Sequence, residues 1–378
     1  MSTPPVPLPA TARLLSVVHR YGPLSRAEAT NRSGLARSAA GVAAERLAAA
    51  GLIELGEHRT AGLGRPSVTL TAAEDGPAAV GVKIEPTGVR AVCYALGGRR
   101  EATHTDTVPL LGMAPDEIAA RIADAADVVL GDRRERCVGI VLAFPGMVDP
   151  LTGTVLTSLS LGWEGPVPLA SLVGEAVDAR LPGLGAAIGT APVSLVRDSS
   201  ATAVGLCGER PGERTLVVVG EYDGVGAALM GADGDAEALE LGHVPVDPAG
   251  APCRCGARGC LELFVSDEAL APVLIAHESG EGPAALEPAA ERLGVALVGA
   301  LNTVGPRALV LTGLLGQLAV AVPHAVDRAL AASVAARVRG TAFRVTQDPD
   351  AAVRGAAELA LRPLLDDPSR WRRPQRAG

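Results

Sequence analysis

The sequence predicts an α/β protein in which a small helical domain precedes a large domain of alternating strands and helices. Two observations lead to this fold class. Short apolar runs rich in Val, Leu and Ala recur between residues 78 and 313, with helical segments between several of them. Residues 11–50 carry helical patterns instead, and the stretch 72–77 separates the two kinds of pattern.

The composition is that of a globular protein with a large core. The chain has 378 residues, of which 48% are hydrophobic and only 2% aromatic, so Leu, Val and Ala must supply the packing. Six Cys in a chain of this length do not make a disulfide scaffold. The N-terminus lacks the pattern of a signal peptide, and no apolar run reaches the roughly 18 residues of a membrane span. We therefore expect a cytoplasmic protein.

Charge is distributed unevenly between the two parts of the chain, whose net charge is −8. Residues 1–72 hold eight Arg and four Glu, a balance of about +4, whereas the remainder holds 26 basic and 38 acidic residues, a balance of about −12. A basic small domain on an acidic large one indicates a polyanion as the partner of the small domain alone.

Three helices are predicted near the N-terminus. Residues 11–20 place Leu and Val near helical spacing. Ser25 followed by Glu28 is a capping box that begins a short second helix, which Ser33-Gly34 ends. A third helix is predicted from about Arg37 to Ala50, before a glycine.

Two strands follow these helices, at "GLIELG" and "SVTLT", with a turn between them. Three helices followed by such a ribbon form the winged version of the helix-turn-helix. A small helical interaction module is the alternative. We expect the domain to span residues 1–72, followed by a linker at 73–77.

The large domain is predicted from six apolar runs that read as strands, at 78–84, 88–96, 137–144, 193–198, 214–220 and 307–313. Helical patterns lie between them, as at 115–130 and 289–304. About 300 residues are too many for one lobe, so two lobes around a cleft are expected.

Four soft metal ligands lie within eighteen residues: His243, Cys253, Cys255 and Cys260. One imidazole and three thiolates suit tetrahedral zinc, and a full set of four protein ligands favours a structural over a catalytic site. Neighbouring glycines let the backbone curl so that the sulfurs converge. A redox pair is the alternative. The other three Cys stand in or beside apolar runs and are assigned to the core: Cys93, Cys137 and Cys207.

The stretch "ELGHVPVDPAGAPCRCGARGCLE" closely resembles the zinc signature of the ROK family, which groups repressors, uncharacterised reading frames and sugar kinases. The resemblance continues through "SRAEATNRSGLARS", "AFPGMVDPLTGTV", "LSLGW", "DGVGAALMGADG" and "AAVRGAAELAL". It implies the two-lobed actin-like (ribonuclease H-like) ATPase-type fold. The first lobe would span 78–196, completed by a helix at about 350–365, and the second lobe 197–349.

The chain departs from the family where the kinases bind phosphate. The kinases carry Asp-x-Gly-Gly-Thr, but here Lys83 stands in place of the Asp, and Glu85 and Pro86 replace the two Gly. Glu repels a phosphate, and Pro has no N–H to donate. In the second phosphate loop, Tyr222-Asp223 replaces Gly-Thr. We therefore expect no ATP binding, no kinase activity and no catalytic residue.

By resemblance, a sugar or sugar-phosphate effector would bind at Ser160, Arg197, Asp198, Glu240, His243 and Glu262. Asp198 matches the general base of the kinases and here would only accept a hydrogen bond from a sugar hydroxyl. Arg197 replaces an Asn of the family and Ser160 another. Arg197 suggests an anionic ligand or else forms a surface salt bridge; Ser160 would otherwise be a turn residue.

Operator DNA is the expected partner of the winged domain, as duplex bound by a homodimer or homotetramer. The predicted contacts are Arg37, Ser38, Ala39, Gly41, Val42, Arg59 and Arg65. Because few of these side chains are long and polar, direct base reading looks thin, and phosphate contacts and the wing would supply much of the affinity.

Three functions remain open at this stage. The favoured one is a transcriptional regulator of the repressor type that senses a sugar-like effector. The second is a sugar kinase with an appended helix-turn-helix, against which Lys83, Glu85 and Pro86 argue. The third is a regulator without a small-molecule site, which the changes at Ser160 and Arg197 motivate.

Overall fold

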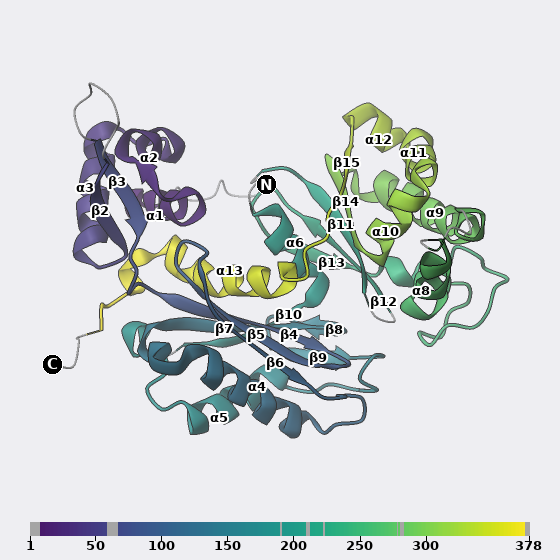
Figure 1. The fold of residues 1–378 in the computed structure, drawn as a ribbon, viewed down its shortest axis with the longest axis horizontal. Helices are drawn as coiled ribbons and strands as arrows, with labels where there is room; N and C mark the ends of the chain where they lie inside the picture. Colours follow the sequence, from purple (N-terminus) through teal and green to yellow (C-terminus); the bar gives the residue numbers. More distant parts are fainter. Residues whose placement is uncertain are drawn as a thin grey trace.

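The computed structural model describes residues 8–58, 67–189, 191–208, 212–221, 224–277, 279 and 283–374. They form an N-terminal helical part with a small sheet, followed by two mixed sheets that are each covered by helices (Figure 1). The predicted α/β class, with a winged helical part before a two-lobed body, is confirmed.

The N-terminal part consists of α1 (Ala10–Tyr21), β1 (Leu24–Ser25), α2 (Arg26–Ser33), α3 (Arg37–Ala49), β2 (Ile53–His58) and β3 (Ser67–Ala72). The predicted capping box is present: the Ser25 hydroxyl accepts from the Glu28 backbone N–H, and the Glu28 carboxylate accepts from that of Ser25. The predicted ribbon gains a short third strand, since β1 pairs with β3. The turn between β2 and β3, with the predicted wing residues Arg59 and Arg65, lies outside the described residues.

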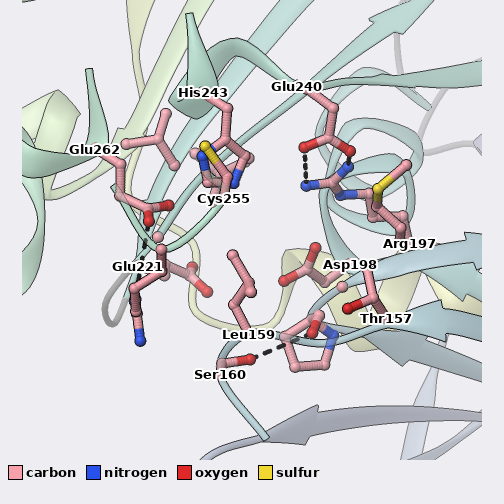
Figure 2. A pocket seen from close by; sticks show the side chains of 18 of the residues that line it. Thr157, Leu159, Ser160, Arg197, Asp198, Glu221, Glu240, His243, Cys255 and Glu262 are labelled. Carbon is pink, nitrogen blue, oxygen red and sulfur yellow. Dashed lines mark hydrogen bonds and ion pairs between the residues drawn. The ribbon is translucent and has the colours of Figure 1, made fainter. Parts of the chain in front are cut away.

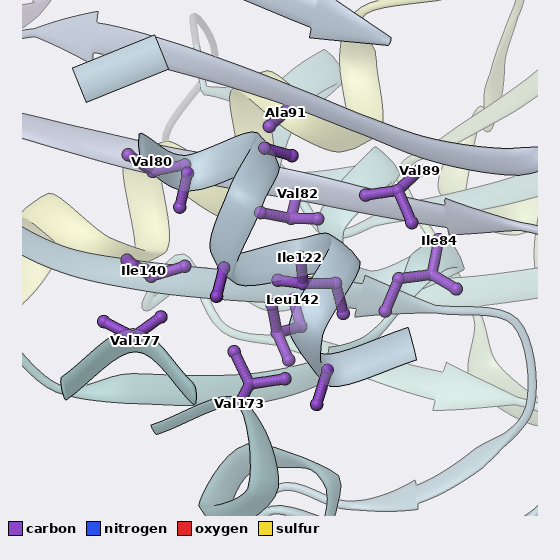
Figure 3. Packing of buried hydrophobic residues seen from close by; sticks show 14 of the residues in the cluster. Val80, Val82, Ile84, Val89, Ala91, Ile122, Ile140, Leu142, Val173 and Val177 are labelled. Carbon is purple, nitrogen blue, oxygen red and sulfur yellow. The ribbon is translucent and has the colours of Figure 1, made fainter. Parts of the chain in front are cut away.

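The first-lobe sheet has the strand order β10-β7-β4-β5-β6. Its strands are β4 (Ala78–Glu85), β5 (Gly88–Ala95), β6 (Arg100–Thr107), β7 (Cys137–Phe144) and β10 (Val193–Arg197). The helices α4 (Pro115–Leu130) and α5 (Leu169–Arg180) cover one face, where Val82 and Ile84 pack toward Ile122 (Figure 3). The short β8 (Met147–Asp149) and β9 (Thr154–Thr157) form a separate hairpin.

The second-lobe sheet has the order β13-β12-β11-β14-β15. Its strands are β11 (Thr215–Glu221), β12 (Gly224–Met230), β13 (Ala236–Leu239), β14 (Ala308–Gly313) and β15 (Ala342–Val345). The helices of this lobe are α7 (Glu262–Val265), α8 (Asp267–Ala276), α9 (Glu287–Val304), α10 (Leu314–Ala321), α11 (Pro323–Ala332) and α12 (Val334–Arg339). In the core of this lobe, Leu216, Val218 and Leu309 pack against α9 and α10.

Two helices lie between the sheets: α6 (Asp198–Cys207) and α13 (Ala351–Asp366), which matches the predicted closing helix. They touch backbone to backbone. A Cβ on Gly355 would stand 1.8 Å from the Ala201 carbonyl oxygen, and one on Gly205 would stand 2.0 Å from that of Ala351. On the other side of α13, a Cβ on Gly81 of β4 would stand 1.9 Å from the Val353 carbonyl oxygen. Only glycine fits at these three contacts.

The winged part packs directly on the first lobe and on α13 (Figure 1). His19 of α1 is 7% exposed; its Nδ1 accepts from the Gly97 N–H at 2.8 Å, and its Nε2 lies 2.8 Å from the Glu358 carboxylate. Because Nδ1 is an acceptor, the ring proton sits on Nε2 and is donated to Glu358. Near the C-terminus, the Trp371 indole donates to the Ala50 carbonyl at 3.1 Å. Polar contacts therefore hold the winged part at two separate points.

The predicted linker 73–77 is also fixed to the first lobe, since Arg136 donates to the Gly76 carbonyl at 2.8 Å. The predicted domain boundaries remain predictions. Among the described residues, no helix combines the length and apolar character needed to cross a membrane. Cys93, Cys137 and Cys207 are buried, as expected of core residues.

We predict that Gly355→Ala destabilises the protein by about 1–3 kcal/mol, because the methyl group would push α13 away from the α6 backbone. Urea unfolding measures the change. Gly174→Ala in α5 is the control, since a Cβ there meets nothing within 4 Å. That helical site should be neutral or gain up to about 1 kcal/mol. Equal effects at both sites would show that the close contact has no special weight.

Candidate functional site

A cavity of about 400 Å³ lies between the two lobes. This volume falls in the range that holds a small ligand. The first lobe lines the cavity with the loops that follow β7 and β9. The second lobe lines it with the end of β11, the start of β12 and the loops near residues 240 and 255. All six predicted effector residues line it, namely Ser160, Arg197, Asp198, Glu240, His243 and Glu262. The fold thus brings these residues together from widely separated segments.

Asp198 stands at the first position of α6, directly after β10. Its carboxylate accepts from the Ser199 backbone N–H at 2.7 Å and faces the cavity (Figure 2). Burial raises the pKa of Asp198, and the nearby charges of Arg197 and Lys83 offset only part of that rise. An ionised carboxylate held here would readily accept a hydrogen bond from a hydroxyl donor.

Arg197 and Glu240 form a two-pronged ion pair across the cavity (Figure 2). Arg197 ends β10 of the first lobe, and Glu240 follows β13 of the second. Arg197 Nη2 donates to Glu240 Oε2 at 3.0 Å, and Arg197 Nη1 donates to Glu240 Oε1. The structure therefore shows a salt bridge of Arg197, but in the cavity wall and not on the surface, with the Arg197 side chain only 13% exposed.

Ser160 lies in the loop after β9. Its hydroxyl contacts the Pro145 carbonyl at 3.3 Å and the Ser158 hydroxyl at 3.2 Å (Figure 2). The hydroxyl is thus already engaged by its own loop, but it remains in the cavity wall.

His243 and the three Cys form one cluster, in which every ligand atom lies within 4.8 Å of the others. The Cys255 and Cys260 sulfurs are 3.6 Å apart, and the Cys253 sulfur is 3.8 Å from His243 Nδ1. Tetrahedral zinc with ordinary bond lengths needs ligand separations of about 3.6–3.8 Å. The donor set and its spacing therefore fit a metal such as zinc. Gly259, with φ of 59°, makes the tight return that brings Cys260 to the cluster.

The metal-type cluster and the cavity share a wall. His243 and Cys255 line the cavity, and Glu262 begins the short helix α7 two residues after Cys260. Glu262 is 8% exposed. The Arg254 guanidinium lies 3.9 Å from its carboxylate. A metal here would order the loop that carries these side chains, while the four protein ligands leave the ion no open position.

The residues that replace the family's first phosphate-binding motif lie at the base of the same cavity. Pro86 lines it, and Lys83 is buried behind Glu221, whose carboxylate enters the cavity (Figure 2). Lys83 and Glu85 are paired with each other at 2.9 Å. Tyr222 and Asp223 lie outside the described residues.

The predicted DNA-contact residues of α3 differ in how exposed they are. Arg37, Ser38 and Val42 of α3 are exposed, and Ala39 is half-buried. Gly41 is buried, and a Cβ there would meet the Arg26 guanidinium at 2.8 Å. The exposed face of α3 is therefore formed by Arg37, Ser38 and Val42, and Gly41 does not contribute to it.

Several cavity residues were not singled out from the sequence, among them Met147, Glu221 and Arg254. Arg254 lies between two cluster Cys, a position that could have pointed to it. Glu221 ends a buried strand, and nothing in the local pattern marks it.

The fold and this cavity define a class of two-lobed α/β proteins with a metal-type cluster in the wall of an interlobe cavity. The model of one family in this class, the ROK family, matches residues 100–362. The chain belongs to the ROK family, as the resemblance of residues 240–262 predicted.

Both repressors and sugar kinases are among its relatives. The chain is 25% identical over 329 residues to a xylose repressor of Bacillus spizizenii, across 79% of this chain and 80% of that protein. It is 30% identical over 168 residues to a glucokinase of Halalkalibacterium halodurans, across 41% of this chain and 47%, about half, of that enzyme. A crystal structure of a ROK family transcriptional regulator, a homologue of the Escherichia coli Mlc protein, shares the fold with a TM-score of 0.70, at 20% identity over 95% of this chain and 96% of that one.

We predict that Cys253→Ser removes most of the bound zinc from the purified protein, because three of four ligands hold the ion much less tightly. Metal analysis by mass spectrometry measures the zinc content per chain. Cys207→Ala is the control, since this buried Cys lies in α6, outside the cluster. Equal zinc contents in the two variants would exclude the cluster as the site.

Proposed function

We propose that this protein is a transcriptional regulator that binds operator DNA through its winged part and a sugar-like effector in the interlobe cavity. The observation that carries the proposal is the attachment of a winged helical part to a family fold whose cavity is intact. The winged part packs on α13, and α13 packs on α6, whose first residue, Asp198, lines the cavity. A ligand that moves Asp198 is thus mechanically connected to the DNA-binding part.

The cavity chemistry supports a polyhydroxyl ligand. Asp198 and Glu262 present carboxylates to it, and carboxylates accept charge-assisted hydrogen bonds from sugar hydroxyls. With one imidazole nitrogen on the metal, His243 would keep the other for the ligand. Apolar side chains such as Met147 and Leu159 supply surface for the carbon skeleton. The repressor relatives support this assignment, and the glucokinase relative supports a sugar as the ligand type.

Three features argue against phosphoryl transfer. Pro86 removes a backbone donor, and Glu221 places a carboxylate in the cavity wall, while the Glu85 carboxylate pairs with Lys83. The positive charge of Lys83 is neutralised by Glu85 and Glu221 and is not available to a phosphate. We therefore propose that the chain is not an enzyme and that the metal is structural.

The exposed face of α3 supports duplex DNA as the partner of the winged part. Arg37 and Ser38 stand at the start of α3, where side chains and backbone N–H groups can meet phosphate. The exposed Val42 supplies an apolar contact that suits a thymine methyl group. A homodimer or homotetramer would set the spacing of two such faces along the duplex.

Selection of genomic fragments tests the DNA-binding part of the proposal. The full-length, zinc-loaded protein should retain particular duplexes at low salt and lose affinity steeply as salt rises. Arg37→Ala should weaken binding several-fold and lower the salt slope by about one. Arg180→Ala on α5 of the first lobe is the matched control and should behave like the wild type. Failure of the folded protein to select any duplex at low salt would refute the proposal.

The raised pKa of Asp198 predicts that effector binding weakens on acidification. The ionised carboxylate accepts hydroxyl donors, so affinity should fall as pH drops through the raised pKa, at a higher pH than for an ordinary Asp. Calorimetric titration of sugars between about pH 8 and pH 5 measures this. Asp198→Asn should bind about tenfold more weakly at pH 8 and lose this part of the pH dependence. An unchanged profile in the variant would contradict the assignment.

A sugar kinase is the second candidate, because Asp198 is retained at the position of a general base and a glucokinase is among the relatives. A coupled assay with ATP and a panel of hexoses decides between them. We expect no turnover above the Asp198→Asn background; turnover lost in that variant would favour the kinase.

A further inference from the structure

The two lobes are joined from within by an ion pair centred on Lys83. Lys83 lies on β4 of the first lobe, and its Nζ is 2.5 Å from Glu221 Oε2 at the end of β11 in the second lobe. Glu85, on the same strand as Lys83, contributes Oε1 at 2.9 Å. The Lys83 side chain is 7% exposed. One buried ammonium group therefore bridges a carboxylate from each lobe.

The residue type at this position is informative. Lys83 is the only Lys among the 34 basic Lys and Arg residues of the chain. An ammonium group is a compact point charge with three donors, whereas guanidinium is a wide, planar fork. Two carboxylates that converge on one atom from different strands suit the ammonium. The wide guanidinium of Arg, which the chain uses at every other basic position, matches this convergence less well.

The charge on Lys83 is maintained despite burial. Burial lowers the pKa of Lys83, but the charges and hydrogen bonds of Glu221 and Glu85 raise it by more, so the net shift is upward. Loss of one partner would leave a charge buried with less compensation, which is costly inside a protein. The bridge is therefore broken only by separating the lobes or by replacing one of its members.

A second interlobe pair lies on another side of the cavity. Arg197 of the first lobe holds Glu240 of the second. Glu221 and Glu240 both line the cavity (Figure 2). Each pair therefore fixes one cavity carboxylate through a cation from the opposite lobe. The two pairs flank the space in which a ligand would sit.

We propose that Lys83 is a positioning residue that keeps the lobes closed without any bound ligand and holds Glu221 in the cavity wall. Ligands commonly drive lobe closure in two-lobed proteins. Here a buried ion pair of the chain itself supplies that link, at the base of the cavity. The proposal goes beyond the proposed function, because it holds whether or not a sugar binds.

Amine labelling tests the closure directly, since Lys83 carries the only side-chain ammonium in the chain. The full-length protein is treated with a water-soluble N-hydroxysuccinimide acetate, and acetylation of the peptide that contains Lys83 is followed by mass spectrometry. In the wild type, Lys83 should react much more slowly than in the urea-unfolded chain. Equal rates in the two states would overturn the proposal.

Two glutamate variants separate lobe opening from a local change in reactivity. Glu221→Gln and Glu85→Gln each remove one carboxylate from Lys83, but only Glu221→Gln breaks the link between lobes. We expect labelling on the order of tenfold faster in Glu221→Gln than in Glu85→Gln. Equal rates in the two variants would mean that Lys83 senses its charge environment and does not hold the lobes.

Small-angle scattering of Lys83→Met gives a second, chemically independent measurement. This variant keeps the length of the side chain but leaves Glu85 and Glu221 facing each other without a cation. The radius of gyration should increase relative to the wild type, with Glu85→Gln as the unchanged control. A scattering curve identical to that of the wild type, for a folded Lys83→Met protein, would reject the clamp.

Discussion

Backbone contact between α13, α6 and β4 is the constraint on which the rest of this molecule depends. Gly81, Gly205 and Gly355 leave no room for a Cβ, so the helices and the sheet meet at the closest distance that chains allow. Such a contact has one well-packed arrangement and resists sliding. Since α6 begins at Asp198 in the cavity and α13 carries Glu358, which binds His19 of the winged part, the interlobe cavity and the winged part share this one packed unit.

Charge organises the cavity that this unit supports. Asp198, Glu221, Glu240 and Glu262 all line it, and two of these acids are held by cations from the opposite lobe. Buried ion pairs contribute little net stability but define one geometry, because a charge displaced from its partner is expensive to bury. The pairs thus leave Asp198 and Glu262 as the cavity carboxylates best able to accept hydroxyl donors. A metal held by His243 and the three Cys would order the loop that carries Glu262.

Local patterns in the sequence predicted most of the fold. The apolar runs became β4, β5, β7, β10, β11 and β14. All of these except the edge strand β10 are largely buried, and a strand buried on both faces must be apolar throughout. The strand β6 was missed, since it lies at a sheet edge and alternates polar and half-buried residues. The short β1, β13 and β15 also lie at sheet edges, where long-range pairing supplies what the local sequence does not.

By itself, the sequence determined which residues have the chemistry for a site: the His and Cys ligands, the carboxylates and the missing phosphate glycines. Only the tertiary structure decided how they are used. It buried Gly41, paired Arg197 with Glu240, and placed Glu221, unremarkable in its strand, against Lys83 across 138 positions of the chain. Spacing along a chain predicts contacts within a turn or hairpin, whereas contacts between lobes depend on how two independently formed sheets pack. That packing follows from side-chain volumes summed over the core, which no single segment contains.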